Sequence, residues 1–248
     1  SCLRQDRALP PASANALRWL RPYLVAWQAL PVKRRDPIRV TERLTYWTEP
    51  HPSWQPNPEW PEDVGCVLYA GPRAVVLIDP LVRGDGWKWL DEAVAAAGTP
   101  VVVLLTAPWH ERGTRDVVAR YEARVWAAPL ARRRIGDLPL LDDLPRGIEV
   151  FEPRGVDEGQ VAFWIAVERT LVVAEFLLGT NAGLHVRPSP STSDMHEFVE
   201  SLRELGELPI ERVLVAHGPP ILHDGREAVS AALRAFSVEP STPLEPSG

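Results

Sequence analysis

The sequence has few cysteines and no long hydrophobic run, and both absences limit what the protein can be. Its two cysteines, Cys2 and Cys66, lie far apart in the 248 residues, so no disulfide framework is expected and a cytoplasmic protein is favoured over a secreted one. The longest apolar runs have the length of a strand, and no basic segment leads into an apolar one near the first residue. Neither a membrane span nor a signal peptide is therefore expected.

The sequence also lacks a strong excess of charge of either sign, and several catalytic motifs do not occur in it. The net charge is −6 and no block of five or six like charges occurs, which argues against a general nucleic-acid-binding protein. The basic groups at residues 33–35 and 132–134 are interpreted as solvated surface. The sequence contains no G-x-S-x-G elbow, no phosphate-binding loop and no G-x-G-x-x-G after a strand, and Cys66 lies inside a predicted strand, where a nucleophile would not be exposed.

The hydrophobic residues that are present, 45% of the chain, are enough for a buried core, and their spacing changes along the first half. Strands are predicted at residues 45–48, 64–69 and 74–78, the last two forming a hairpin that ends at Asp79-Pro80. A helix at 87–97 that stops at Gly98, a buried strand at 101–105, a helix at 114–121 and a short strand at 124–126 follow. Residues 128–147 carry no clear pattern.

The second half repeats this order of strands followed by helices. Strands are predicted at residues 148–151, 160–167 and 170–174, with a tight turn at Glu168-Arg169, and a loop rich in Gly, Pro and Ser is predicted at 179–191. A helix at 196–205 capped by Ser193, a strand at 212–215 and a helix at 224–236 begun by Asp224 complete the pattern. Two β-rich halves, each followed by helices, predict an α/β (α+β) protein built as a four-layer αββα sandwich.

The predicted domain spans residues 44–237, and the two ends of the chain differ from it. Residues 1–43 form an N-terminal extension of helix and loop, in which apolar residues recur at helical spacing from Ser13 to Leu30 with an interruption at Pro22. The sequence leaves open whether this helix packs on the domain, covers a site as a lid or pairs two subunits in a homodimer. The Pro and Ser content of residues 238–248 predicts a disordered tail.

A polar cluster follows the most apolar predicted strand, at the position where α/β proteins commonly place functional residues. It consists of Trp109, His110, Glu111 and Arg112, after Leu105-Thr106. Together with four other segments in the same order, this run resembles the metallo-β-lactamase-like hydrolases, whose signature is a threonine followed by H-x-H-x-D-H. The other segments are Ile78-Asp79-Pro80, residues 155–161, Val173-Ala174-Glu175 and Ala216-His217-Gly218-Pro219. The resemblance covers residues 44–236 and implies the same αββα sandwich, with a site at the edge between its two sheets.

The resemblance also implies that most of the family's metal ligands are replaced in this chain. Ala107 and Trp109 stand for the first two histidines, Glu111 and Arg112 for the aspartate and the third histidine, Val156 for the next histidine, and Glu175 for the bridging aspartate. Only His217 is unchanged. Because neither alanine nor tryptophan offers a lone pair to a metal, an intact dinuclear zinc site is not expected.

We therefore predict a former active-site pocket that holds no cofactor and binds a small molecule, with a role as an interaction protein left open. The catalytic candidates are His217, Glu175, Glu111 and His110, and the substrate-binding candidates are Trp109, Arg112, Asp79 and Trp54. Buried carboxylates need a cation nearby, so Glu111 and Arg112 are expected to form an ion pair in the vacated site. The loop around Trp54 is expected either to form one wall of this pocket or to anchor itself on the core.

Two hydrolase hypotheses stay open beside this one. In the first, Glu111, Glu175 and His217, with or without His110, hold a single zinc or other divalent ion that activates water on an ester, thioester or amide. In the second, no metal is present and His217 acts with a carboxylate as acid and base. Purely structural roles also remain open: His217 could close a tight loop, and Asp79 could form a turn with Pro80.

Overall fold

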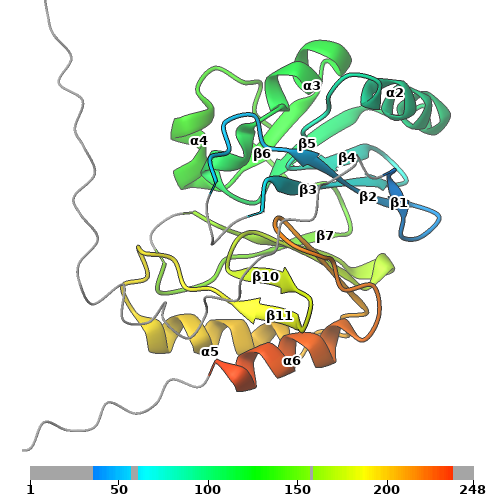
Figure 1. Ribbon diagram of the computed structural model, residues 1–248. Helices are drawn as coiled ribbons and strands as arrows, with labels where there is room; N and C mark the ends of the chain where they lie inside the picture. Colours follow the sequence, from blue (N-terminus) through cyan, green and yellow to red (C-terminus); the bar gives the residue numbers. More distant parts are fainter. Residues whose placement is uncertain (1–35, 57–60, 157–158, 237–248) are drawn as a thin grey trace, which may run out of the picture.

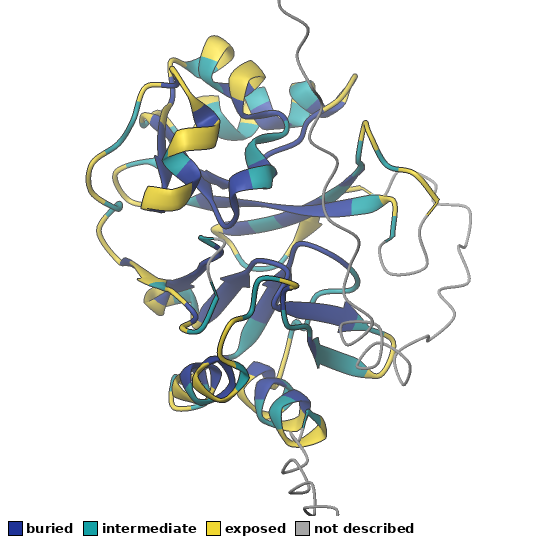
Figure 2. Cartoon of the chain, turned by 90° about the vertical axis from the view of Figure 1, so that its left-hand side faces the viewer, coloured by how far each residue is buried: buried dark blue, intermediate teal, exposed yellow. Residues whose placement is uncertain are grey.

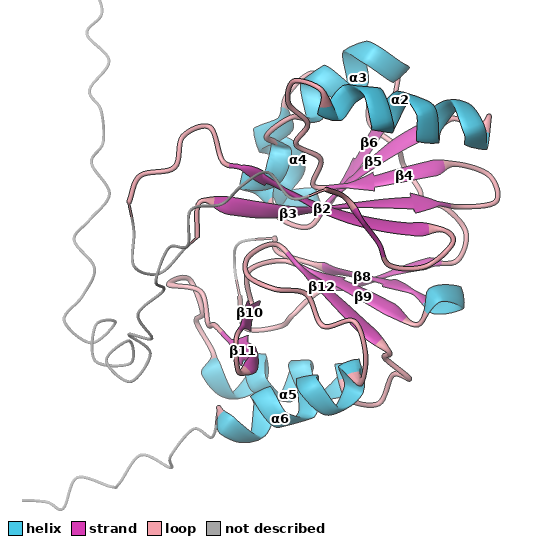
Figure 3. Cartoon of the chain, turned by 45° about the vertical axis from the view of Figure 1, so that its right-hand side comes forward, coloured by secondary structure: helices cyan, strands magenta, loops and turns pink. Residues whose placement is uncertain are grey.

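Two β-sheets packed face to face form the centre of the molecule, and helices cover both outer faces. The structure is a computed structural model and describes residues 36–56, 61–156 and 159–236. Helices α2, α3 and α4 lie on one outer side and α5 and α6 on the other (Figures 1 and 3). This arrangement confirms the predicted four-layer αββα sandwich. The helix predicted at residues 13–30 and the tail from 238 lie outside the described residues.

The first half of the chain forms a six-stranded sheet in the order β1-β2-β3-β4-β5-β6. Its strands are β1 (Ile38–Arg39), β2 (Leu44–Pro50), β3 (Asp63–Ala70), β4 (Val75–Ile78), β5 (Val101–Leu105) and β6 (Arg124–Ala127). The first four pair antiparallel, whereas β4, β5 and β6 are parallel. Its helices are α2 (Gly86–Ala97), α3 (Thr114–Tyr121) and α4 (Pro129–Ile135), the last within the segment that carried no clear pattern. β1 lies before residue 44, the predicted start of the domain.

The second half forms a four-stranded sheet in the order β12-β9-β8-β7. Its strands are β7 (Ile148–Phe151), β8 (Ala162–Ile165), β9 (Thr170–Val173) and β12 (Arg212–Val215), and its helices are α5 (Met195–Leu205) and α6 (Gly225–Ala235). The loop predicted at residues 179–191 is wrong in part, because β10 (Leu177–Thr180) and β11 (Gly183–Val186) form an antiparallel hairpin there. The tight turn predicted between β8 and β9 is a short 3-10 helix, η3 (Ala166–Glu168), followed by Arg169 at a φ of 47°.

Alternate residues of each strand enter different layers of the core. In β4, Val75 and Leu77 pack toward the helices, whereas Val76 and Ile78 pack toward the other sheet, where they meet Phe163 of β8. Side chains alternate along a strand, so a sheet that is covered on both faces needs this continuous run of apolar residues. Figure 2 shows the buried residues along the strands and on the inward sides of the helices. None of the described helices is long and apolar enough to cross a membrane.

Cys66 belongs to this core and is unsuited to catalysis, as predicted. It lies in β3, is 1% exposed, and burial raises the pKa of its thiol to about 12. The thiolate is the nucleophilic form of cysteine. A thiol with so high a pKa is therefore not a nucleophile at neutral pH.

The sequence pattern predicted that Ser193 caps α5, but the residue that caps this helix is Asp194. The Asp194 carboxylate accepts a hydrogen bond from the Glu197 backbone N–H at 2.9 Å, whereas the Ser193 hydroxyl donates to the Gly155 carbonyl at 3.4 Å and, within the described residues, caps no N–H of the helix. Replacing an N-cap aspartate with alanine typically costs about 0.5–2 kcal/mol. We expect this loss in the free energy of unfolding for Asp194→Ala and a much smaller one for Ser193→Ala, both measured by urea denaturation. Similar losses in the two variants would contradict the assignment.

Candidate functional site

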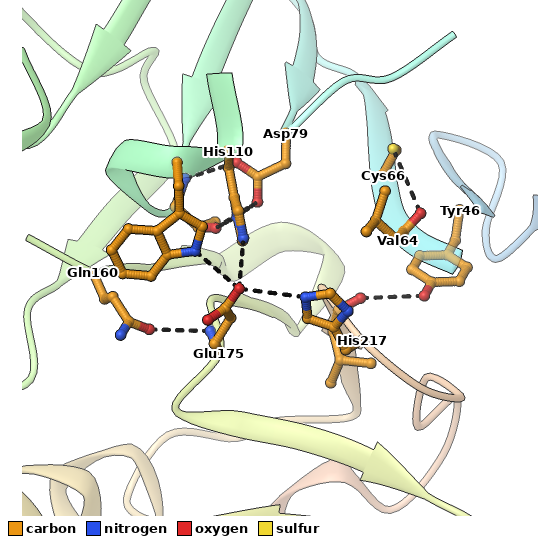
Figure 4. Close-up of polar contacts among 11 residues, drawn as sticks. Tyr46, Val64, Cys66, Asp79, His110, Gln160, Glu175 and His217 are labelled. Carbon is orange, nitrogen blue, oxygen red and sulfur yellow. Dashed lines mark hydrogen bonds and ion pairs between the residues drawn. The ribbon is translucent and has the colours of Figure 1, made fainter. Parts of the chain in front are cut away.

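Four chain segments that follow strands meet at one edge between the two sheets. Asp79 follows β4, the polar cluster after β5 forms the 3-10 helix η2 (Pro108–Glu111), Glu175 comes soon after β9, and His217 comes soon after β12. Figure 4 shows their side chains pointing toward one another. Because β4 runs parallel to β5 and β9 runs parallel to β12, the ends of each pair share an edge. The topology therefore explains why residues far apart in sequence come together here.

Asp79 fixes the orientation of His110 by contacting Nδ1, the ring nitrogen that faces away from Glu175. Its carboxylate accepts hydrogen bonds from the Thr106 backbone N–H, at 2.9 Å, and from the Thr106 hydroxyl, and it lies 2.8 Å from His110 Nδ1. A carboxylate only accepts, so Nδ1 of His110 carries the proton toward Asp79 and Nε2 faces the centre of the site. Burial and the charge of Arg112 oppose protonation of His110, but Asp79 and Glu175 outweigh them and raise its pKa.

Glu175 is the centre of the site. Its Oε1 accepts a hydrogen bond from Trp109 Nε1 at 2.9 Å and lies 3.3 Å from both His110 Nε2 and His217 Nε2. Burial alone would raise the pKa of Glu175, but the hydrogen bonds from the two histidines hold it far below its usual range. For His217, burial dominates over the attraction of Glu175, and its pKa is lowered. Glu175 is therefore an ionised carboxylate between two imidazoles.

The loop that carries His217 is tightly closed, as one structural hypothesis predicted. Gly218 has a φ of 87°, and a Cβ added there would lie 1.9 Å from the carbonyl oxygen of Gly179. The Gly179 N–H donates to the His217 carbonyl at 3.0 Å, and the Tyr46 hydroxyl donates to the Val215 carbonyl at 3.2 Å. Because only glycine fits such a backbone, the turn sets the position of His217. The residue thus closes a loop and also enters the site.

A cavity of about 390 Å³ opens beside Glu175. Five of the eight predicted site residues line it, namely Trp54, Trp109, Arg112, Glu175 and His217, whereas Asp79, His110 and Glu111 do not. The other lining residues are His51, Ser53, Gln55, Pro61 and Val64. The loop that carries Trp54 therefore forms one wall, as one of the two expectations for it stated. His51 was missed as a site residue, although it belongs to this loop.

The predicted ion pair between Glu111 and Arg112 is wrong. Oε2 of Glu111 and both Nε and Nη1 of Arg112 are buried without a hydrogen-bond partner in the part of the chain that the structure describes. The reason is the geometry of η2, which turns His110 toward the centre and takes Glu111 away from the cavity. His110, and not Arg112, is the residue that lies between the two buried carboxylates of Asp79 and Glu175, and they raise its pKa.

Comparison with solved structures finds the same architecture in several metallo-β-lactamases. The metallo-β-lactamase from Pontibacter korlensis matches with a TM-score of 0.59 at 16% identity, covering 80% of this chain and 98% of that one. DIM-1 metallo-β-lactamase exposed to ceftazidime gives 0.60 at 13% identity, with coverage of 84% and 100%. The chain has the metallo-β-lactamase fold. No protein-family model matches the sequence, and no curated protein matches it either.

The metallo-β-lactamase fold implies metal ions, so the donor set here can be tested against that expectation. His110, Glu175 and His217 offer three ligand atoms that all lie within 4.8 Å of one another. Two imidazoles and a carboxylate form a ligand set that zinc accepts, and ligands of a tetrahedral zinc ion lie about 3.3 Å apart, given bonds of about 2.0–2.1 Å. The carboxylate on Nδ1 of His110 also resembles the outer partner of many metal-binding histidines. The described residues fit one ion, and they contain no second such group.

Proposed function

We propose that the protein binds a small molecule in the cavity beside Glu175 and lacks an intact dinuclear zinc site. The cavity itself carries this proposal: its volume is about 390 Å³, and apolar side chains that include Trp54 and Trp109 line it together with polar and charged groups that include Arg112 and Glu175. Small-molecule sites are typically concave and mostly apolar, with a small number of placed polar groups that orient the ligand.

The position of Trp109 supports the loss of the dinuclear site. Its indole N–H points at Glu175 Oε1, 2.9 Å away, and an indole N–H donates but cannot coordinate. A tryptophan therefore occupies a ligand position of the family signature and gives its hydrogen bond to the carboxylate. Asp79 and Glu175 also raise the pKa of His110, which favours a positive charge at the same place when no ion is bound.

A fragment screen tests the binding proposal. We expect some members of a mixed set of neutral, anionic and cationic fragments to bind in ligand-observed NMR and to bind at least about tenfold more weakly to Trp54→Ala, since loss of an aromatic wall removes about 1.4 kcal/mol or more. Val167→Ala is the matched control, because Val167 is 67% exposed and does not line the cavity. Absence of binding, or equal binding to both variants, would contradict the proposal.

A second candidate is a hydrolase of an ester, thioester or amide that uses one divalent ion. The observation that favours it is the close approach of donor atoms from His110, Glu175 and His217. Such an ion would polarise the scissile carbonyl and make bound water nucleophilic at neutral pH. The chain's own contribution would be orientation: Asp79 keeps Nε2 of His110 toward the centre, and Trp109 fixes the carboxylate. Without an ion, His217 beside Glu175 would remain as an acid and base pair.

Metal analysis separates these candidates. We expect protein purified without chelator to contain fewer than two ions per chain, because the described residues group only three donors. One ion that is lost in His217→Ala but kept in His196→Ala, together with a Tm that falls in chelator, would support the hydrolase. His196 is a matched control, since its side chain is 88% exposed. No ion and a Tm unchanged by chelator would support the binding role, and two ions would refute the proposal.

A further inference from the structure

Arg112 carries a charge that no described residue pairs through a hydrogen bond or a short ion pair, although at longer range it helps to lower the pKa of Asp79. Its Nε and Nη1 are buried without a hydrogen-bond partner there, although the side chain lines the cavity. The guanidinium is charged at every accessible pH, and an unpaired charge withdrawn from water is costly. The backbone holds it in place: Arg112 has a φ of 20°, and the next residue, Gly113, donates to the Pro80 carbonyl at 3.2 Å. A cation held in this way indicates that an anion belongs beside it.

His51 adds a second hydrogen-bond donor to the same cavity. The Ser53 backbone N–H donates to His51 Nδ1 at 3.2 Å, so Nδ1 holds a lone pair and the ring proton is on Nε2. Burial, followed by the charges of Arg112 and His110, lowers the pKa of His51, so the ring is neutral at neutral pH. His51 therefore offers an N–H donor on the wall of the cavity, without adding a charge.

The remaining walls limit what the anion can be. Trp54, Trp109, Pro61 and Val64 are apolar and would cover an organic body of modest size. Glu175 lines the same cavity, and its Oε1 is already occupied by contacts from Trp109, His110 and His217. A ligand with one negative charge meets less repulsion from this carboxylate than a dianion such as a phosphate monoester.

We propose that the ligand is a small organic carboxylate, whose oxygens bind Arg112 and His51 while its apolar body packs between Trp54 and Trp109. The planar guanidinium matches a carboxylate in geometry as well as in charge. This inference rests on the proposed small-molecule function and names the class of ligand.

The probes for this inference are benzoate, its neutral analogue benzamide, and phenyl phosphate, each titrated into the full chain by calorimetry or ligand-observed NMR. We expect benzoate to bind at least about tenfold more tightly than benzamide, because only benzoate pairs with the guanidinium. Arg112→Gln should lose this preference, and Arg112→Lys should keep part of it, since an ammonium keeps the charge but not the fork geometry. Arg133→Gln is the control, because Arg133 is exposed on α4.

The outcomes separate this inference from the proposed function. Equal binding of benzoate and benzamide, both weakened by Trp54→Ala, would overturn the carboxylate assignment but leave the small-molecule pocket standing. Phenyl phosphate binding more tightly than benzoate would also overturn it, as would absence of benzoate binding at millimolar concentration. A tenfold preference for benzoate that survives in Arg112→Gln would show that Arg112 is not the anion-binding group. Circular dichroism of each variant checks that the fold is kept.

Discussion

Replacing Glu175 with leucine is expected to lower the free energy of unfolding by about 3–5 kcal/mol, because it removes one partner from a buried polar group and with it the acceptor that three neighbouring side chains share. The side chain of Glu175 is 11% exposed, and its Oε1 meets Trp109, His110 and His217 together. Without the carboxylate, the Trp109 N–H loses its acceptor, and Nε2 of His110 loses its contact, while Nδ1 of His110 keeps Asp79 and Thr106 as partners.

The matched control for this prediction is Glu175→Gln. The amide keeps an oxygen that can accept from Trp109 but loses the charge that holds His110 and His217, so we expect a loss of about 1–3 kcal/mol. Urea denaturation in the presence of chelator measures both variants, so that no bound ion contributes to the difference. A loss of less than about 1 kcal/mol for Glu175→Leu would show that the histidines do not depend on this carboxylate.

Most of the sandwich could be predicted from the sequence because its strands and helices have clear periods. The unbroken apolar run of β5, Val101–Leu105, is typical of a parallel strand buried on both faces, and the structure places it so. The hairpin of β10 and β11 was missed because Gly179, Gly183 and nearby prolines read as loop. Its pairing depends on backbone hydrogen bonds and on packing against the rest of the domain, which local composition does not encode.

The site was only partly predictable, for a geometric reason. Comparison with the family signature assumes that residues after β5 keep their order in space, and it placed Glu111 at the centre with Arg112 as its partner. The chain instead forms η2, in which Pro108 begins a 3-10 turn of three residues per turn, so His110 faces Glu175. Nor could sequence order predict that the Trp109 N–H meets Glu175, because that contact joins loops from the two different sheets.

Replacing Arg112 with methionine is expected to raise the free energy of unfolding by about 1–4 kcal/mol in the absence of ligand, while abolishing carboxylate binding. Replacing a whole buried ion pair with apolar residues is often neutral or stabilising by this amount, since the desolvation cost disappears, and we expect the same of a buried charge that has no close partner. Two features of Arg112 favour such a gain. Two of its buried nitrogens have no hydrogen-bond partner among the described residues. Methionine is also an unbranched side chain, long enough to fill much of the space that the arginine leaves.

The comparison with Arg133→Met shows whether this gain comes from the environment of Arg112 or from the chemistry of the substitution. Arg133 is exposed on α4, and surface changes of this kind usually stay within about 0.5 kcal/mol. Benzoate should then stabilise the wild type and Arg133→Met against thermal unfolding but leave Arg112→Met unchanged, because a ligand stabilises only the state that binds it.

If Arg112→Met were less stable than the wild type without ligand, the guanidinium would be contributing to the fold, and its unpaired state would not indicate a site for an anion. A more stable variant that no longer responds to benzoate would instead show that stability is given up at this position to hold a binding group.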